Sequence, residues 1–401
     1  MSGSALELLD LVARWVHLIA GVMWIGNSLL FNWMDRRLEP ARSGARTPEP
    51  LGTIWLLHSG GFYYVEKTLL AGLSLPAPVH WFKWQAYTTW WSGAVLLVVV
   101  YYAGGRAVLA DPGVASLSHA QAVAVGASAI VGGWLLYEAM QRLVAPRAPA
   151  LATAVWIAGL GAISIGLTRL LSGRAAFLHV GAMLGTIMAA NVVFTIVPSQ
   201  RELIASVAGG RGGNPAVSGR AKRVSIHNNY FTFPVLALML SAHFPSLYGE
   251  RLNWLALLVL IAAGVAVRHL LNIRFSYRAW RPVLGATLAA TMASLYAIVR
   301  IGSASRPSAV PDSPLPVTFA EARHVIDRRC AACHSSQPSD PTIGAAPGGV
   351  MFDTPEQIIA YAARIRERAV VTRTMPAANK TRITDQERAL LGRWVEQGAR
   401  R

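Results

Sequence analysis

The first three-quarters of the chain is a succession of long apolar stretches, and this feature limits the fold more than any other. A helix of ~20 mostly apolar residues can cross the hydrocarbon core of a bilayer. Because lipid offers the backbone no hydrogen-bond partners, segments that cross it must be helical or form a closed barrel. The sequence therefore predicts an all-α fold, a polytopic membrane helix bundle with about eight spans, near residues 11–34, 87–109, 120–144, 151–171, 175–198, 230–247, 253–273 and 282–301.

The composition changes sharply after residue 301. The whole chain is 53% hydrophobic and 14% charged, against ~45–50% and ~25% in soluble domains. From Thr318 onward, however, it is polar, and the stretch before it is rich in Ser and Pro, as exposed and fairly stiff linkers are. We expect a membrane domain over residues 1–302, a linker over 303–317 and a small soluble domain over 318–401. The first apolar segment is too long for a signal peptide and lacks a basic start, so we expect no cleavable signal.

The net charge of +17 does not indicate nucleic-acid binding, because the basic residues lie between apolar segments instead of forming one basic face. Alternate loops carry most of them, which is the pattern of a membrane protein whose basic loops are cytoplasmic. Both termini are then on the outer side. The basic loops follow the first, third, fifth and seventh predicted spans and include Arg36, Arg37, Arg42, Arg46, Arg142, Arg147, Arg201, Arg211, Arg220, Lys222, Arg223, Arg274 and Arg278.

The soluble part contains Cys330-Ala331-Ala332-Cys333-His334, the attachment pattern of a covalent c-type haem. Two thiols bond the porphyrin and the adjacent imidazole binds the iron. The chain has only these two cysteines, so no disulfide framework competes; the alternatives are a chance match and a redox-active C-x-x-C pair. Haem is attached in this way on the periplasmic side of a bacterial inner membrane. The motif and the loop charges thus both predict a multi-pass inner (cell) membrane protein with a periplasmic N-terminus and tail.

Residues 318–401 have the helix signals of a small cytochrome c domain. We expect a first helix that runs into the haem motif, a middle helix and a last helix with one apolar face, which Gly398 can end. The N-cap signals are of the capping-box and Pro-at-N1 types. They are Thr318 with Glu321, Thr354 with Pro355, and Thr384 with Glu387; the apolar face of the last helix carries Leu390, Leu391, Trp394 and Val395.

The expected axial ligands of the haem iron are His334 and a methionine. Met375 precedes Pro376 in a loop between the middle and last helices, and Pro376 stiffens that loop. Met351, next to Gly348-Gly349, is the rival. We favour Met375. A thioether ligand raises the reduction potential, so the domain should accept electrons readily.

Three histidines of the membrane domain are candidate catalytic residues. Ionisable side chains at membrane depth are functional hypotheses by default, and these three lie toward the predicted periplasmic ends of the first, fifth and sixth spans. Imidazoles at one depth would suit a haem b held by two histidines or a polar substrate pocket; the alternative is that each is only an interfacial or hydrogen-bonded residue. The three are His17, His179 and His243, and Asn191, Trp24 and Asn27 could add polar or stacking contacts.

Two aromatic stretches stand out, and the first is too short and too polar to be a span. The stretch 58–67, in the long loop after the first span, reads as an interfacial helix or a re-entrant piece. The stretch 227–234 reads as the start of the sixth span with an interfacial aromatic belt.

At these stretches the chain resembles the membrane-integral urate oxidase (urate hydroxylase) family with a C-terminal cytochrome c domain. The resemblance covers nearly the whole chain and ends in the haem motif of the tail. It rests on Arg14-Trp15-Val16-His17, Trp24-Ile25-Gly26, His58-Ser59-Gly60-Gly61-Phe62-Tyr63, His80-Trp81-Phe82-Lys83-Trp84, His227-Asn228-Asn229-Tyr230 and His243-Phe244-Pro245.

The resemblance implies hydroxylation of urate to 5-hydroxyisourate. Electrons would pass to the c-type haem and on to a downstream cytochrome or terminal oxidase, so hydrogen peroxide would not be a product. A urate site near the cytoplasmic face would need an intermediate electron carrier, because the hydrocarbon core is ~30 Å thick. From the residues alone, an electron-transfer cytochrome anchored in the membrane, passing quinol electrons to cytochrome c, is the alternative. An oxygen-reducing oxidase is disfavoured, since no histidine arrangement resembles a haem–copper centre.

Overall fold

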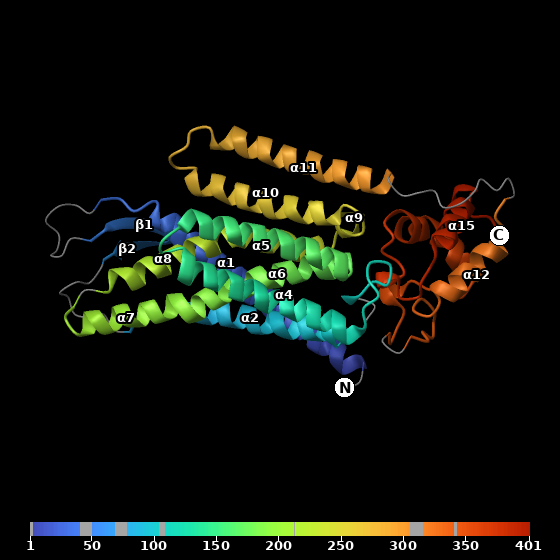
Figure 1. The fold of residues 1–401 in the computed structure, drawn as a ribbon, viewed down its shortest axis with the longest axis horizontal. Helices are drawn as coiled ribbons and strands as arrows, with labels where there is room; N and C mark the ends of the chain where they lie inside the picture. Colours follow the sequence, from blue (N-terminus) through green and yellow to red (C-terminus); the bar gives the residue numbers. More distant parts are fainter. Residues whose placement is uncertain are drawn as a thin grey trace.

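The computed structural model describes residues 3–40, 50–68, 78–103, 109–211, 213–304, 316–340 and 343–401. Long helices form an elongated bundle, and a smaller group of short helices from the C-terminal tail lies against one end of it (Figure 1). The bundle helices are α1 (Gly3–Asp35), α2 (Lys83–Leu97, continued by a π-helical turn Val98–Tyr102), α4 (His119–Ala139, continued by Met140–Val144), α5 (Pro149–Leu170), α6 (Gly173–Asn191), which continues through Val192–Ile196 into α7 (Val197–Ala208), α8 (Pro215–Ser241), the short α9 (Pro245–Tyr248), α10 (Asn253–Ile273) and α11 (Trp280–Ala304).

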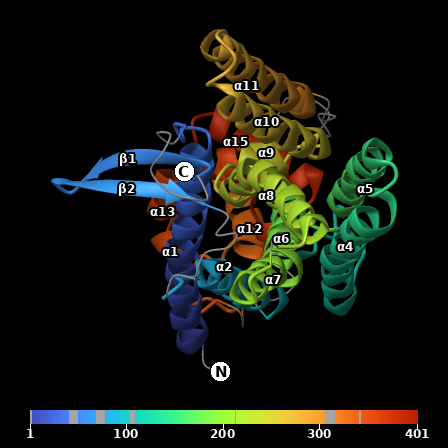
Figure 2. The same cartoon turned by 90° about the vertical axis from the view of Figure 1, so that its left-hand side faces the viewer.

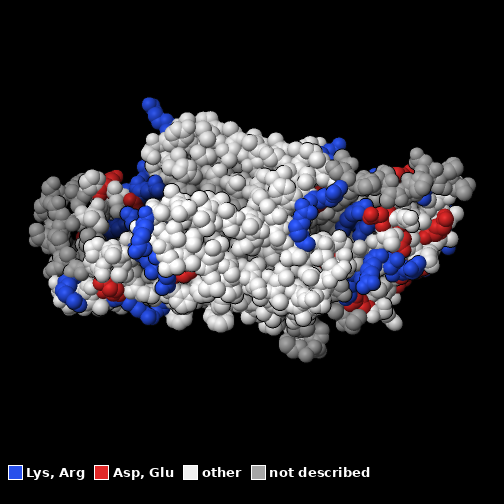
Figure 3. All heavy atoms as spheres, viewed as in Figure 1, with Lys and Arg blue, Asp and Glu red and all other residues white. Residues whose placement is uncertain are grey.

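Six helical segments in the described part of the chain are long and apolar enough to cross a membrane. They are Leu8–Asp35, His119–Val144, Pro149–Leu170, Gly173–Ala208, Asn253–Ile273 and Trp280–Gly302. The two other expected spans also overlap helices, and residues 104–108 of the span expected at 87–109 lie outside the described residues. Helix α2 is short, however, and α8 begins well before residue 230 and carries charged residues in its first turns. Charged side chains gather toward the two ends of the bundle and leave an uncharged band between them (Figure 3). The chain is therefore consistent with a multi-pass helical membrane protein.

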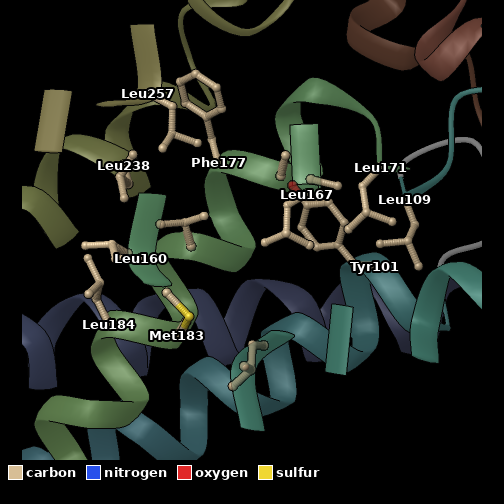
Figure 4. Close-up of a cluster of buried hydrophobic side chains, with 14 of the residues drawn as sticks. Tyr101, Leu109, Leu160, Leu167, Leu171, Phe177, Met183, Leu184, Leu238 and Leu257 are labelled. Atoms are coloured by element: carbon tan, nitrogen blue, oxygen red, sulfur yellow. The ribbon is translucent and has the colours of Figure 1, made fainter. Parts of the chain in front are cut away.

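Helix α6 is the centre of the bundle. It packs against α4, α5 and α8, and its side chains have no exposed surface at Phe177, Val180 and Met183. Small residues let the neighbouring helices approach closely, as is usual in membranes: a Cβ atom on Gly126 of α4 would lie 2.5 Å from Nε2 of His179. Figure 4 shows the resulting apolar cluster, in which Phe177, Met183 and Leu184 of α6 meet Leu160, Leu238 and Leu257 of the surrounding helices.

A β-hairpin replaces the interfacial helix or re-entrant piece expected at residues 58–67, so that expectation was wrong. Strands β1 (Gly52–His58) and β2 (Gly61–Lys67) are antiparallel, with Trp55 opposite Tyr64. Ser59 and Gly60 have φ values of 51° and 76°, which a two-residue hairpin turn requires. The hairpin projects from the side of the bundle (Figure 2). Apolar residues on both of its faces obscure the alternation that would have identified strands.

The first helix begins at the end of the bundle that faces the tail, whereas the hairpin lies at the opposite end (Figure 1). This arrangement agrees with the prediction that the N-terminus and the tail share one side. Most of the expected linker, residues 305–315, lies outside the described residues.

The tail has its own apolar core, in which Ile326, Ile358, Leu391 and Trp394 are buried. Its helices are α12 (Phe319–Arg329), α13 (Pro355–Ala360), α14 (Ala362–Ile365, continued by Arg366–Val371) and α15 (Asp385–Glu396), with single turns at Pro347–Gly349 and Ala377–Asn379. All three predicted N-caps are confirmed. Thr318, Thr354 and Thr384 each accept a hydrogen bond from the backbone three residues on, and Gly398 follows the last helix with φ +92°.

The tail touches the bundle at the turn after α9. A Cβ atom on Gly249 would lie 2.6 Å from the carbonyl oxygen of Thr372 and 3.6 Å from Cγ2 of Thr374. It would also lie 2.9 Å from the carbonyl oxygen of Pro245. Thr372 and Thr374 belong to the loop that leads to Met375. The absence of a side chain at Gly249 therefore lets this loop reach the bundle.

We expect Gly249→Ala to loosen this contact. The backbone at Gly249 has φ −82°, which alanine adopts freely, so the effect comes from crowding, worth about 1–3 kcal/mol. Hydrogen exchange of the full chain should show the amides of residues 371–375 exchanging roughly tenfold faster, since 1.4 kcal/mol is tenfold in an equilibrium constant.

Gly285→Ala in α11 is the matched control, because a Cβ there would meet nothing within 4 Å. Equal exchange in wild type and Gly249→Ala would show that the contact does not hold the loop.

Candidate functional site

A cavity of about 500 Å³ lies in the half of the bundle nearer the hairpin. Its walls come from the second half of α1, the start of α2, the run from α6 into α7 and the middle of α8. Its volume is within the ~300–1,000 Å³ common for small-molecule sites. The lining is mostly apolar, with a few polar side chains that include Asn27, Gln85, Gln200, Asn228 and Thr232.

Two amide side chains form a matched pair on the cavity wall. Nδ2 of Asn27 donates a hydrogen bond of 2.7 Å to Oε1 of Gln85. In the described part of the chain, Oδ1 of Asn27 and Nε2 of Gln85 make no further hydrogen bond. The lining thus offers an acceptor, Oδ1 of Asn27, and a donor, Nε2 of Gln85, on two bonded side chains. Together they can bind a ligand edge that presents a neighbouring N–H and C=O, as a cyclic amide does.

Aromatic rings and one cation complete the walls near this pair. Phe31 of α1 and Phe82 before α2 pack edge to face, with ring centroids 5.3 Å apart. Trp24 and Trp81 also line the cavity. Nζ of Lys83 lies 4.7 Å from the ring centroid of Trp81, and no Asp or Glu is among the described lining residues. The cavity is therefore suited to a flat anion with amide-like edges.

A buried hydrogen-bond network fixes Asn228 in the cavity wall. Nδ2 of Asn228 donates to the carbonyl oxygen of Met188 at 3.0 Å. Nδ2 of Asn191 donates to Oδ1 of Asn228 at 2.9 Å and to the hydroxyl of Tyr137 at 3.1 Å. That hydroxyl is 2.8 Å from Nδ1 of His227. His227 is thus a titratable group linked to the cavity wall through hydrogen bonds.

The structure does not bring the three candidate histidines together. Nδ1 of His17 donates to the carbonyl oxygen of Thr89 in α2, at 2.9 Å. His179 is fully buried; its Nδ1 donates to the carbonyl oxygen of Ala175 at 2.7 Å and its Nε2 is 3.2 Å from the Tyr102 hydroxyl. His243 is exposed just beyond α8.

Within the described residues, no hydrogen bond or ring contact joins any two of these histidines, and none of them lines the cavity. The reason is helical phase, since His17 faces α2 while His179 faces α4 and Tyr102. A haem b held between two of these histidines stays a prediction, and we assign no electron step to one. Trp24 and Asn27, expected to accompany these histidines, line the cavity instead, and Asn191 lies behind its wall.

In the tail, the predicted haem ligands occupy a suitable local structure. Cys330 caps the C-terminus of α12. Nδ1 of His334 donates to the carbonyl oxygen of Val350 at 2.9 Å, and the Phe352 amide donates to the carbonyl oxygen of His334 at 2.9 Å. A histidine fixed through Nδ1 presents Nε2 to a metal. The donor set of two thiols and this imidazole fits a covalent c-type haem.

The surroundings of the two thiols do not favour a redox-active pair. Burial of the thiol raises the pKa of Cys330 to about 12. Burial also raises the pKa of Cys333. Both residues as a whole are only partly buried. Reactive C-x-x-C thiols have a lowered pKa instead.

The two candidate methionines lie in different surroundings. Met351 lies between Val350 and Phe352. The carbonyl oxygen of Val350 accepts from Nδ1 of His334, and the amide of Phe352 donates to the carbonyl oxygen of His334. Met375 lies in the loop before α15. Its amide donates to the carbonyl oxygen of Arg368 at 3.0 Å, and its carbonyl oxygen accepts from Nη1 of Arg388 at 2.8 Å. The buried Arg388 also binds the carbonyl oxygen of Ala369. Sequence reasoning missed this role for Arg388.

The first 300 residues match a family of known proteins. The family model described as urate oxidase N-terminal covers residues 3–300. The chain belongs to this family. Comparison with curated proteins and with solved structures found no match. The family supports an oxidoreductase with urate-related chemistry, and its matched region contains the whole described lining of the cavity.

Sequence reasoning also missed the pair of Asn27 and Gln85. These residues are 58 positions apart, and neither carries a charge or a motif. The one signal in the sequence is that both are polar amides in or beside apolar helices. An unbonded polar group is costly there, so each amide is expected to have a partner.

We expect Gln85→Leu to weaken urate binding by roughly tenfold to a hundredfold, because the change removes a donor and leaves Asn27 unpaired. Equilibrium dialysis without an electron acceptor measures the Kd apart from turnover. Thr89→Val, one turn further along α2, is the control: its hydroxyl donates only to the carbonyl oxygen of Gln85 and it does not line the cavity. An unchanged Kd in Gln85→Leu would remove the cavity from consideration as the urate site.

Proposed function

We propose that this protein is a membrane-bound urate oxidase that hydroxylates urate to 5-hydroxyisourate. Electrons pass to the c-type haem of its own tail and on to a downstream cytochrome or terminal oxidase. The observation that carries this proposal is the family match over residues 3–300 on one chain with the C-x-x-C-H tail. The reaction balances as uric acid plus water giving 5-hydroxyisourate, two protons and two electrons, so oxygen gas is not a reactant and hydrogen peroxide is not a product.

The cavity supports the substrate assignment. Urate is a flat anion whose edges alternate N–H and C=O groups. The acceptor of Asn27 and the donor of Gln85 can bind groups on such an edge. The surrounding rings can stack on its faces, and Lys83 supplies positive charge beside Trp81. Apolar side chains make up most of the cavity lining, and an apolar surrounding strengthens polar contacts.

The tail supports the acceptor assignment. Cys330 and Cys333 would hold the haem covalently, and His334 and Met375 would bind its iron. The haem supplies a one-electron acceptor whose potential a thioether ligand raises. Met375 is favoured over Met351 for a geometric reason. Val350, which precedes Met351, bonds Nδ1 of His334, and the Nδ1 side of a metal-binding histidine faces away from the metal when Nε2 is the ligand.

The orientation in the membrane follows from the haem motif of the tail and from the basic loops. Haem attachment requires the tail to be periplasmic, so the hairpin end with its basic loops is cytoplasmic, in agreement with the positive-inside rule. The membrane is then the bacterial inner membrane.

Anaerobic addition of urate to the purified holoprotein tests the function. We expect prompt reduction of the c-type haem, seen in its absorption spectrum, with 5-hydroxyisourate as the product. Gln85→Leu should slow this reduction at low urate concentration and leave reduction by dithionite unchanged. Reduction by quinol but not by urate would instead establish an electron-transfer cytochrome.

Replacing the methionines distinguishes the iron ligands. Met375→Leu should abolish the charge-transfer absorption of methionine-ligated ferric haem and lower the midpoint potential, whereas Met351→Leu should leave both unchanged. The reverse pattern would make Met351 the ligand.

A further inference from the structure

A buried arginine in α10 lacks a compensating negative charge. The side chain of Arg268 is only 3% exposed. Its Nε donates to Oδ1 of Asn229 at 2.9 Å, and its guanidinium carbon lies 5.6 Å from the ring centroid of Phe233. Nη2 is buried and has no hydrogen-bond partner among the described residues.

The amide beside it is also incompletely bonded. Nδ2 of Asn272 donates to the same oxygen of Asn229 at 2.8 Å. Oδ1 of Asn272 is buried and, in the part of the chain that the structure describes, has no partner. Oδ1 of Asn229 thus accepts from two donors, and as an uncharged amide oxygen it does not neutralise the guanidinium. A buried charge without a partner is strongly destabilising.

Further positive charge surrounds this position, at the end of the bundle that carries the hairpin. Arg36 and Arg274 act electrostatically on Arg268. The guanidinium carbons of Arg37 and Arg274 lie 4.3 and 4.5 Å from the ring centroid of Phe275. In the described ranges none of these four arginines pairs with a carboxylate. The nearby Asp35 binds Lys67, at 2.7 Å.

We propose that Arg268, Asn272, Arg36 and Arg274 form a site for a phosphate group, supplied by the headgroup of an anionic phospholipid. A phosphate oxygen accepts the free Nη2–H of Arg268, and the flanking arginines supply the remaining charge. A headgroup hydroxyl donates to Oδ1 of Asn272.

A lipid suits the position. Arg268 lies five residues before the end of α10, which is about 8 Å along the helix, and the exposed rings of Phe275 and Tyr277 mark the level at which lipid headgroups lie. Basic pockets between helices on the cytoplasmic side are a known form of lipid recognition. Arg268 does not line the cavity, so this proposal does not depend on the urate assignment.

The test uses the detergent-purified full chain, with phosphatidylglycerol, phosphatidylcholine or inorganic phosphate added before thermal unfolding and native mass spectrometry. We expect phosphatidylglycerol to raise the Tm of the wild type and to stay bound in the mass spectrum. Arg268→Gln should need roughly tenfold more of this lipid for the same shift, the loss of about 1.4 kcal/mol of binding.

Arg281→Gln is the matched control. It removes the same charge at the same end of the bundle, from a side chain that stacks on Trp280 with 5.5 Å between guanidinium carbon and ring centroid. It should respond as the wild type does. Arg274→Gln decides the matter if Arg268→Gln does not fold, since Arg274 is only partly buried.

A shift produced equally by inorganic phosphate, and lost in Arg268→Gln, would keep the phosphate site but make its ligand soluble. Equal lipid responses in all variants would overturn the proposal. A shift that urate alone produces, and that Arg268→Gln abolishes, would also overturn it by assigning the site to the substrate.

Discussion

The close packing of α6 against its neighbours is the constraint on which the rest of the membrane domain depends. In lipid the backbone is satisfied within each helix, so helices associate through side-chain fit and not through the exclusion of water. Gly126 lets α4 approach the ring of His179. The same helix presents Met188 and Asn191 at its other end, where they build and support the cavity. One end of α6 therefore packs against α4, and the other end forms part of the cavity wall. Because both ends belong to one helix, the distance between these two regions is fixed.

The helices could be predicted because their signals are local. Apolar length indicated the bundle, and the three capping threonines of the tail fixed the starts of its helices, since each needs only residues within one turn. The hairpin could not be predicted from the same signals. Its strands carry apolar side chains on both faces, such as Trp55 and Leu56, so the period of two is lost. Only Ser59-Gly60 marked a turn, and aromatic content suggested a helix at the membrane surface.

The candidate site could be predicted only in part, for a physical reason. Depth in the membrane follows from sequence position, but the direction of a side chain depends on helix rotation, which packing decides. His17 and His179 share a depth and still face different neighbours. Asn27 and Gln85 meet because α1 and α2 pack along their length. The haem motif, by contrast, is contained within five consecutive residues, and its fit depends on one distant contact, that of His334 with Val350.

The cavity and the tail lie at opposite ends of α6, which constrains any transfer of electrons between them. Met188 in the cavity wall and Gly173 at the outer end of the helix are fifteen residues apart, about 22 Å along the axis. In the proposed reaction urate gives up two electrons, and a single haem held by the tail would accept one at a time. The tail would then have to pass on the first electron before it could take the second, and the cavity would have to hold the substrate between the two transfers. An acceptor joined to the same chain would serve this sequence, because covalent linkage holds it at a high effective concentration near the cavity. The contact of Gly249 with Thr372 then matters for rate and not for affinity, since it fixes where the Met375 loop meets the bundle.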